Sequence, residues 1–123
     1  MKRVFLVVLD SFGVGAAPDA AAFGDAGTDT LAACAATGHL SVPNLVSLGL
    51  GNLDGVTAIP RTAAPRGAYA RLQELSQGKD TTIGHWEIAG LVSEKPLPTY
   101  PEGFPEEVLD AFRRATGRGV LCN

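Results

Sequence analysis

The sequence predicts an α/β fold with a mostly parallel sheet, and two observations favour this. The first is the apolar run Val4–Leu9, which ends at the acidic Asp10. A short apolar run that contains β-branched residues and ends at small polar residues is typical of a strand buried on both faces. The second is the series of helix start and stop signals that follows the run. Ligands of open α/β sheets bind beyond the carboxyl ends of the strands, where we expect Asp10.

The composition predicts a folded chain and excludes several function classes. The chain has 123 residues, 46% hydrophobic and 19% charged, which is typical of one modest domain with a core. The net charge is −3 and the basic residues form no long cluster, so nothing favours nucleic-acid binding. The apolar run is too short for a membrane span or a signal peptide. Cys34 and Cys122 lie far apart, and the simpler interpretation is free thiols in a reducing cytoplasm.

The first half of the chain predicts short helices joined by loops. The predicted helical segments cover residues 18–23, 30–36 and 41–49. Pro18 can open the first segment, and Thr28 or Asp29 can cap the second. Residues 50–66 alternate Gly, Pro and polar side chains, which predicts a loop. Residues 68–74 alternate with a period of two, as a partly exposed strand does.

The second half predicts two further helices and a linker. We expect a polar turn at 76–80, a helix over 82–90 and a linker or domain crossing in the proline-rich stretch 91–105. A clear helix then runs to Thr116, with acidic residues in its first turn, basic residues in its last and a glycine after it. Residues 119–122 predict the start of a strand. We therefore expect the front part of a longer protein; the alternative is a complete small α/β domain with a loose C-terminus.

Residues 78–87 form a second group of candidate catalytic and binding residues. Asp80 or Thr81 can cap the following helix, whose first turn presents unpaired N–H groups that bind phosphate. A threonine hydroxyl at this place can act as a nucleophile when metal coordination lowers its pKa. Asp10 would be a ligand of that metal, because a buried carboxylate needs a cation or hydrogen-bond donors.

Each of these residues also has a plainer structural interpretation. Asp10 can be a turn residue and Thr81 an ordinary N-cap. His85 and Trp86 can serve packing or a single polar contact, and Lys79 can be a solvated surface charge. The glycines that follow the apolar run lack the third glycine of a dinucleotide-binding loop, which excludes that class of site.

Taken together, the two groups resemble the phosphopentomutase family of the alkaline phosphatase superfamily. The matching stretches cover residues 7–15, 17–20, 23–25, 29–30, 43–45, 48–52, 78–81, 84–87 and 101–105. The block Gly78-Lys79-Asp80-Thr81 with Gly84-His85-Trp86-Glu87 is quite specific to the family, whereas the aspartate after the first strand is shared across the superfamily. The resemblance implies part of an alkaline-phosphatase-like core over residues 1–96 and the truncated beginning of a cap domain over residues 97–123.

The resemblance also implies a function. The family interconverts ribose or deoxyribose 1-phosphate and the 5-phosphate in nucleoside catabolism, through a phosphothreonine and two divalent metal ions, usually manganese. Thr81 matches that threonine, and Asp10 and Thr81 match metal ligands. Supporting roles near the nucleophile are implied for Lys79, Asp80, His85 and Trp86. The implied substrate is a pentose phosphate, and the implied compartment is the cytoplasm.

One departure from the family pattern limits these expectations. Family members are much longer, and their remaining aspartate and histidine ligands come from the C-terminal part. His39 and His85, the two histidines here, do not match those ligands. We therefore expect that the isolated chain is inactive and that the site needs the remainder of the polypeptide. Two alternatives stay open: another mutase or phosphatase of the superfamily, such as a phosphoglycerate mutase relative, and a small non-catalytic phosphate- or metal-binding module.

Overall fold

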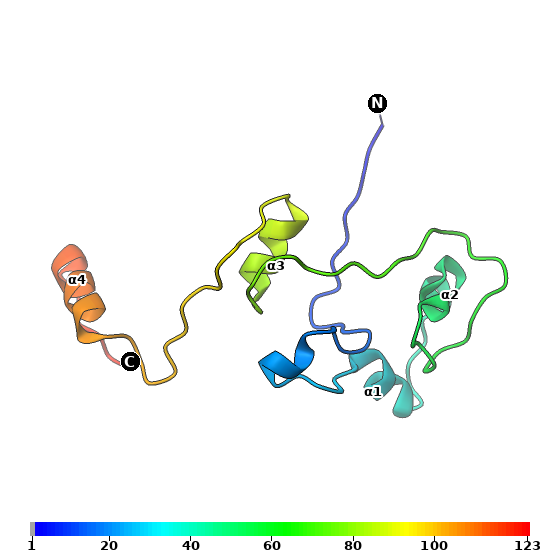
Figure 1. Ribbon diagram of the computed structural model, residues 1–123, viewed down its shortest axis with the longest axis horizontal. Coiled ribbons are helices and arrows are strands. Elements are labelled where there is room, and N and C mark those ends of the chain that lie inside the picture. Colours follow the sequence, from blue (N-terminus) through cyan, green and yellow to red (C-terminus); the bar gives the residue numbers. More distant parts are fainter. Residues whose placement is uncertain (1) are drawn as a thin grey trace. The chain divides into compact units, whose positions relative to one another are not determined.

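The computed structural model describes residues 2–123, which divide into two compact units, one ending at Glu74 and one covering Leu75–Asn123 (Figure 1). The first unit holds the 3-10 helices η1 (Ala20–Phe23) and η2 (Leu50–Asn52) and the α-helices α1 (Thr30–Ala36) and α2 (Pro43–Leu48). The second unit holds α3 (Thr81–Ile88) and α4 (Glu106–Thr116). The domain boundary expected between residues 96 and 97 stays a prediction.

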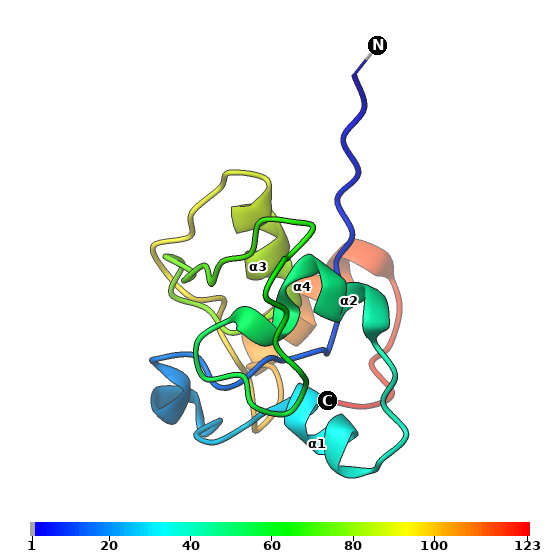
Figure 2. The same cartoon turned by 90° about the vertical axis from the view of Figure 1, so that its right-hand side faces the viewer.

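The predicted α/β fold with a parallel sheet is wrong for this structure. Every regular element within residues 2–123 is a helix, and no strand forms there. The run Val4–Leu9 is an extended trace that leads away from α1 and α2 in both views (Figures 1 and 2). Its side chains are exposed, from 45% at Val8 to 95% at Val4. The strands expected over 68–74 and 119–122 are also irregular segments.

The physical reason lies in where a strand finds its hydrogen bonds. A helix pairs its backbone groups within one segment, whereas a strand needs the backbone of a second segment. Apolar character alone therefore identifies a run that could be buried, but it does not supply the neighbour that turns the run into a strand. No such neighbour pairs with Val4–Leu9 among the described residues.

The helices follow the predicted start and stop signals closely. The Asp29 carboxylate, and not Thr28, caps α1 by accepting a hydrogen bond from the amide of Ala32 at 2.9 Å. Helix α2 begins at Pro43 and ends before Gly49, whose φ of 110° suits glycine. Short-range signals were sufficient here because each cap and each stop acts within one helical turn.

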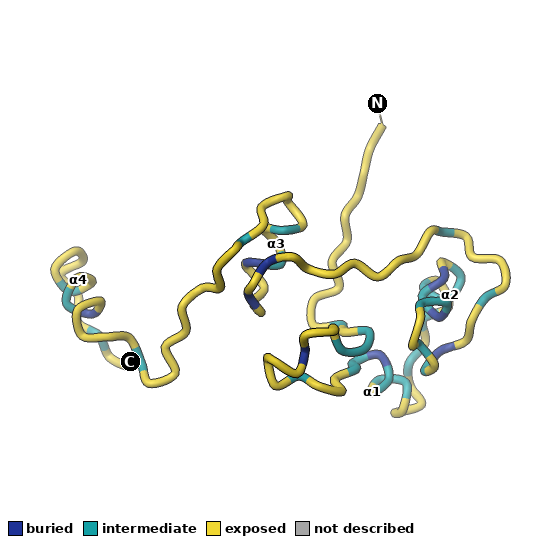
Figure 3. The backbone as a smooth tube through the Cα atoms, viewed as in Figure 1, coloured by how far each residue is buried: buried dark blue, intermediate teal, exposed yellow. Residues whose placement is uncertain are grey.

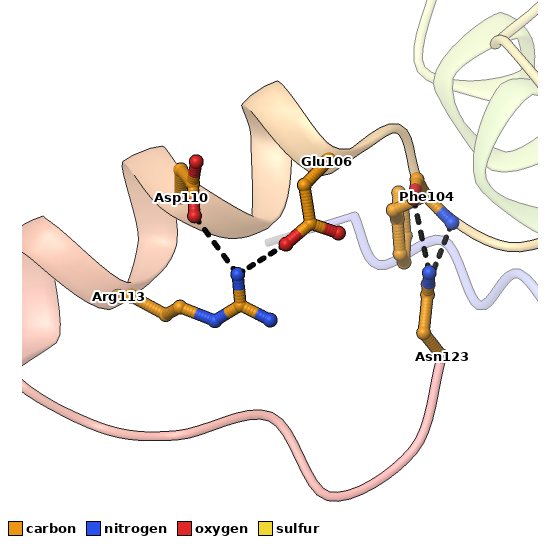
Figure 4. A network of polar contacts seen from close by, with 5 residues as sticks. All are labelled: Phe104, Glu106, Asp110, Arg113 and Asn123. Carbon is orange, nitrogen blue, oxygen red and sulfur yellow. Dashed lines mark hydrogen bonds and ion pairs between the residues drawn. The ribbon is translucent and has the colours of Figure 1, made fainter.

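Helix α4 carries an ion-pair network on its exposed side (Figure 4). The Arg113 guanidinium donates hydrogen bonds to the carboxylates of Glu106 and Asp110, the latter at 2.8 Å. Beside the start of the helix, the Asn123 side chain accepts from the Phe104 amide and donates to the Phe104 carbonyl oxygen. The bounds of α4 confirm the predicted helix. The Asn123 contacts hold the last described residue beside the start of this helix.

Burial is confined to a few places in each unit, drawn dark blue in Figure 3. The buried apolar side chains are Ala20, Leu31 and Ile59 in the first unit and Ile83 and Leu109 in the second. Among them, Leu31 and Ile83 are fully enclosed, with 1% and 0% of their surface exposed. Each unit therefore has a small core, and in the second unit part of it lies on α3.

The predicted loop over 50–66 has more order than its composition indicated. It begins with η2, and the Asn52 side chain then pairs with the backbone of Thr62. The amide nitrogen of Asn52 donates to the Thr62 carbonyl at 2.8 Å, and its oxygen accepts from the Thr62 amide at 2.9 Å. One side chain thus replaces a backbone partner and closes the loop.

Candidate functional site

Asp80 builds the beginning of α3, the helix that carries the candidate nucleophile. Its carboxylate accepts a hydrogen bond from the Ile83 amide at 2.9 Å, and its carbonyl accepts from the Gly84 amide at 3.1 Å. At the other end, Gly90 takes a φ of 96°, and the amide of Leu91 bonds to the carbonyl of Trp86 at 2.8 Å. Both ends of this short helix are therefore closed by standard capping contacts.

Thr81 is the first residue of α3 and is exposed. Within residues 2–123 its hydroxyl has no hydrogen-bond partner, and the amides of Thr81 and Thr82 make no backbone hydrogen bond. An accessible hydroxyl thus lies beside two N–H groups at the positive end of a helix, an arrangement that suits a phosphoryl group.

The close approach of Gly78 to Ile83 holds the segment that leads into α3. Both residues are buried. A Cβ atom added at Gly78 would lie 2.3 Å from Cδ1 of Ile83 and 3.2 Å from Oδ2 of Asp80. Since only a hydrogen fits in that space, glycine lets the chain pass directly over the side chain of Ile83.

His85 lies one helical turn after Thr81 and contacts its backbone. The distance from Nδ1 of His85 to the carbonyl oxygen of Thr81 is 2.7 Å. Because a carbonyl oxygen only accepts, Nδ1 carries the proton in this contact and Nε2 remains an acceptor in the neutral ring. The structure thus places His85 beside the candidate nucleophile.

The remaining supporting residues also lie on α3 or directly before it. Trp86 follows His85 and is 42% exposed, and Lys79 is an exposed residue next to Asp80. The predicted supporting residues therefore share one short segment with Thr81. Their roles in chemistry stay predictions.

Glu87 is a site residue that the sequence reasoning did not select. Its two carboxylate oxygens accept hydrogen bonds from the consecutive amides of Leu75 and Ser76, each at 2.8 Å. The hydrogen bond of the Ser76 side chain and that of the Leu75 amide hold the pKa of Glu87 below its usual value. A glutamate inside the specific block was the available signal, but its partners lie in a segment of no distinctive composition.

Asp10 belongs to the first unit, at the end of the extended run. It is exposed, and its carboxylate accepts a hydrogen bond from the next amide, that of Ser11, at 3.0 Å. Ser11 has a φ of 58°, which is uncommon for a residue other than glycine. Two residues further on, the carbonyl of Gly13 accepts from the amide of Leu31 at 3.0 Å, which ties the turn to α1. A metal shared between Asp10 and Thr81 stays a prediction.

Arg71 adds a cationic group near the same glycine-rich turn. A Cβ atom at Gly15 would lie 3.4 Å from a terminal guanidinium nitrogen of Arg71. Both residues line a recess of about 770 Å³ in the first unit, together with Asp19 and Glu74. Sequence reasoning missed this arrangement because the residues are far apart in the chain.

The described residues do not assemble the two-metal site that the resemblance implies. No group of three or more His, Cys, Asp and Glu side chains with metal-binding geometry occurs within residues 2–123. A carboxylate and a hydroxyl are oxygen donors of the kind that Mg²⁺ and Mn²⁺ prefer, but six-coordinate ions need many more donors than Asp10 and Thr81 provide. These two residues are therefore candidate members of a larger ligand set. No helix in the described part of the chain is long and apolar enough to cross a membrane.

Comparison with known proteins finds close relatives over the entire chain. It is 58% identical to the phosphopentomutase of Lachnoclostridium phytofermentans, 52% identical to that of Acetivibrio thermocellus and 46% identical to that of Clostridium acetobutylicum, each over 124 aligned residues. The alignments include 100% of this chain and 32% of each relative, so the chain spans about a third of the length of the curated relatives it matches. No protein-family model matches the chain.

Proposed function

We propose that this chain, which is related over its whole length to the phosphopentomutase family, supplies the threonine that accepts and donates the phosphoryl group in a phosphopentomutase. The substrate would be ribose or deoxyribose 1-phosphate, which is exchanged with the corresponding 5-phosphate. The single observation that supports this role most directly is the exposed hydroxyl of Thr81 at the N-terminus of α3, which has no hydrogen-bond partner among residues 2–123.

The chemistry assigned to Thr81 is a pair of opposite phosphoryl transfers. In the first, a free sugar hydroxyl attacks the phosphorus of phosphothreonine; the bond to the Thr81 oxygen breaks, a new phosphate ester forms, and the proton passes from the sugar to Thr81. The Thr81 oxygen then attacks the other phosphoryl group of the resulting bisphosphate; the bond from that phosphorus to its sugar oxygen breaks, and the threonine proton passes to the sugar oxygen. The amides of Thr81 and Thr82 are positioned to stabilise the negative oxygens of the group in transit.

The second candidate contribution is that of Asp10, as a metal ligand from the first unit. Two divalent metal ions, expected to be manganese, would supply charge neutralisation and a lowered hydroxyl pKa when bound. Since the described residues hold only part of the necessary ligand set, we expect the isolated 123-residue chain to lack mutase turnover. Both cysteines are free thiols, which supports the proposed cytoplasmic location.

The experiment compares two neighbouring threonines in the protein expressed from the complete open reading frame that contains this sequence. Thr81→Ala should abolish both the phosphothreonine, measured by peptide mass spectrometry, and the interconversion of pentose phosphates, measured by ³¹P NMR. Thr82→Ala is the matched control: it removes an exposed hydroxyl on the same first turn but keeps the backbone amide of residue 82, so it should retain both. Undiminished turnover in Thr81→Ala would overturn the proposed function.

A further inference from the structure

One hydrogen-bond network joins helix α3 to the segments before and after it, residues 75–78 and 91–93. We call this network the Glu87 clasp. The carboxylate of Glu87 accepts from the amides of Leu75 and Ser76 at 2.8 Å each. The Ser76 hydroxyl oxygen accepts from the amide of Ser93 at 3.0 Å, and the amide of Gln77 donates to the carbonyl of Ser93 at 3.0 Å. Glu87 thus binds the segment before α3, and Ser76 and Gln77 in that segment bind Ser93 after the helix.

We propose that Glu87 is a positioning residue for Thr81: by clasping the segment before α3, its carboxylate sets the place of the threonine hydroxyl. This inference rests on the proposed function of Thr81 as phosphoryl acceptor. Glu87 lies six residues after Thr81 on α3 and acts through the backbone that leads to Thr81.

The path from the clasp to Thr81 is short and well packed. Ser76 is 9% exposed, so its contacts with Glu87 and Ser93 are shielded from competition with water. Two residues later, Gly78 lies against the fully buried Ile83 of α3. Asp80 then caps the helix through the Ile83 amide, and Thr81 follows directly. The backbone between the Glu87 clasp and Thr81 has little freedom to move, because buried packing and a helix cap fix it.

The charge and shape of glutamate are both needed for this arrangement. A carboxylate accepts at both oxygens, and a charged acceptor makes stronger hydrogen bonds than a neutral one. In Glu87→Gln one oxygen is replaced by an NH₂ group, which would face the N–H of Leu75 or Ser76 and repel it. In Glu87→Asp the side chain is one methylene shorter and does not reach both amides from the same backbone position.

The test uses Glu87→Gln in the protein expressed from the complete open reading frame, with Glu94→Gln as the control. Glu94 is exposed and makes no hydrogen bond or ion pair among residues 2–123, so the control removes the same charge without breaking a contact. Turnover, KM for the pentose phosphate and phosphorylation of Thr81 are measured together with amide hydrogen exchange at Leu75 and Ser76. We expect Glu87→Gln to lower kcat by about 10–100-fold with KM unchanged, because displacement of a reacting group affects the chemical step.

The possible outcomes separate this inference from the proposed function. Faster amide exchange at Leu75 and Ser76 together with the fall in kcat, and neither change in Glu94→Gln, would support the positioning role. Faster exchange with kcat at the wild-type value would overturn it, while Thr81 phosphorylation in the wild-type protein would leave the proposed function standing. A loss of kcat/KM that arises from a higher KM alone, with kcat unchanged, would also overturn the positioning role. Absence of phosphothreonine in the wild-type protein would overturn both.

A second variant covers the case in which Glu87→Gln does not fold. Ser76→Ala removes the hydroxyl oxygen that accepts from the Ser93 amide but keeps both amide hydrogen bonds to the Glu87 carboxylate. We expect a smaller fall in kcat than for Glu87→Gln, again with KM unchanged. A wild-type kcat in Ser76→Ala with demonstrably faster exchange at Leu75 would contradict the inference.

Discussion

Asp10 and Thr81, the two oxygen donors of the proposed site, are held in different ways. Asp10 follows an exposed extended run, and its carboxylate accepts a hydrogen bond from the next amide, that of Ser11. Thr81 begins a helix that is capped by Asp80, packed through Ile83 and clasped by Glu87. A reactive group on a capped and packed helix is held in place by contacts within its own segment. A group at the end of an unpaired extended run lacks such contacts.

The largest expected effect is a loss of unfolding free energy at a buried side chain of the second unit, compared with an exposed side chain of the first. Ile83→Ala should lower the free energy of unfolding of the second unit by about 2–5 kcal/mol, because a fully buried side chain loses its contacts and leaves a cavity. Leu6→Ala is the control: Leu6 is 72% exposed, and its removal should change stability by no more than about 0.5 kcal/mol. Urea unfolding monitored by NMR measures both. Equal losses for the two variants would refute the contrast.

The next effect comes from the close packing at Gly78. Gly78→Ala should cost about 1–3 kcal/mol, since the new methyl group would collide with the buried Ile83 side chain. Gly119→Ala is a suitable control, because within residues 2–123 no atom beyond its two chain neighbours lies within 4 Å of its added Cβ. Thermal unfolding of the two variants gives the comparison. A neutral Gly78→Ala would show that the segment can move away from α3.

A smaller effect is expected at the helix cap. Asp80→Ala should destabilise α3 by about 0.5–2 kcal/mol, because the amide of Ile83 loses its acceptor. Asp80→Asn should retain nearly all of this stability, since asparagine caps a helix about as well. Hydrogen exchange at Ile83 measures the difference, and unchanged protection in Asp80→Ala would be inconsistent with the cap.

The smallest effect is the pH dependence of the Glu87 clasp. The pKa of Glu87 is lower in the folded chain than its ordinary value of 4.5, so the stabilisation is present above 4.5 and is lost as the pH falls through the folded value. The amide resonances of Leu75 and Ser76 should therefore shift together in acid. The shift should be missing in Glu87→Gln. Its persistence in that variant would assign the titration to another group.

The sequence by itself determined the features whose causes lie within one helical turn. The sequence predicted the stops at Gly49 and Gly117 and the block around Thr81, and it narrowed each cap to two neighbouring residues, of which the structure shows Asp29 and Asp80. The similarity to phosphopentomutases over the whole chain confirms the family that this block indicated.

The tertiary structure alone decided the state of the apolar run and the partners of Glu87. The predicted strand Val4–Leu9 remained unpaired among the described residues, and the carboxylate of Glu87 found amides 11 and 12 residues away. Ser76 and Ser93, which complete the clasp, are separated by 17 residues. Helix bonds and caps join residues at most five apart, so local sequence specifies them. Contacts over longer separations depend on which segments meet, and the local sequence does not specify that.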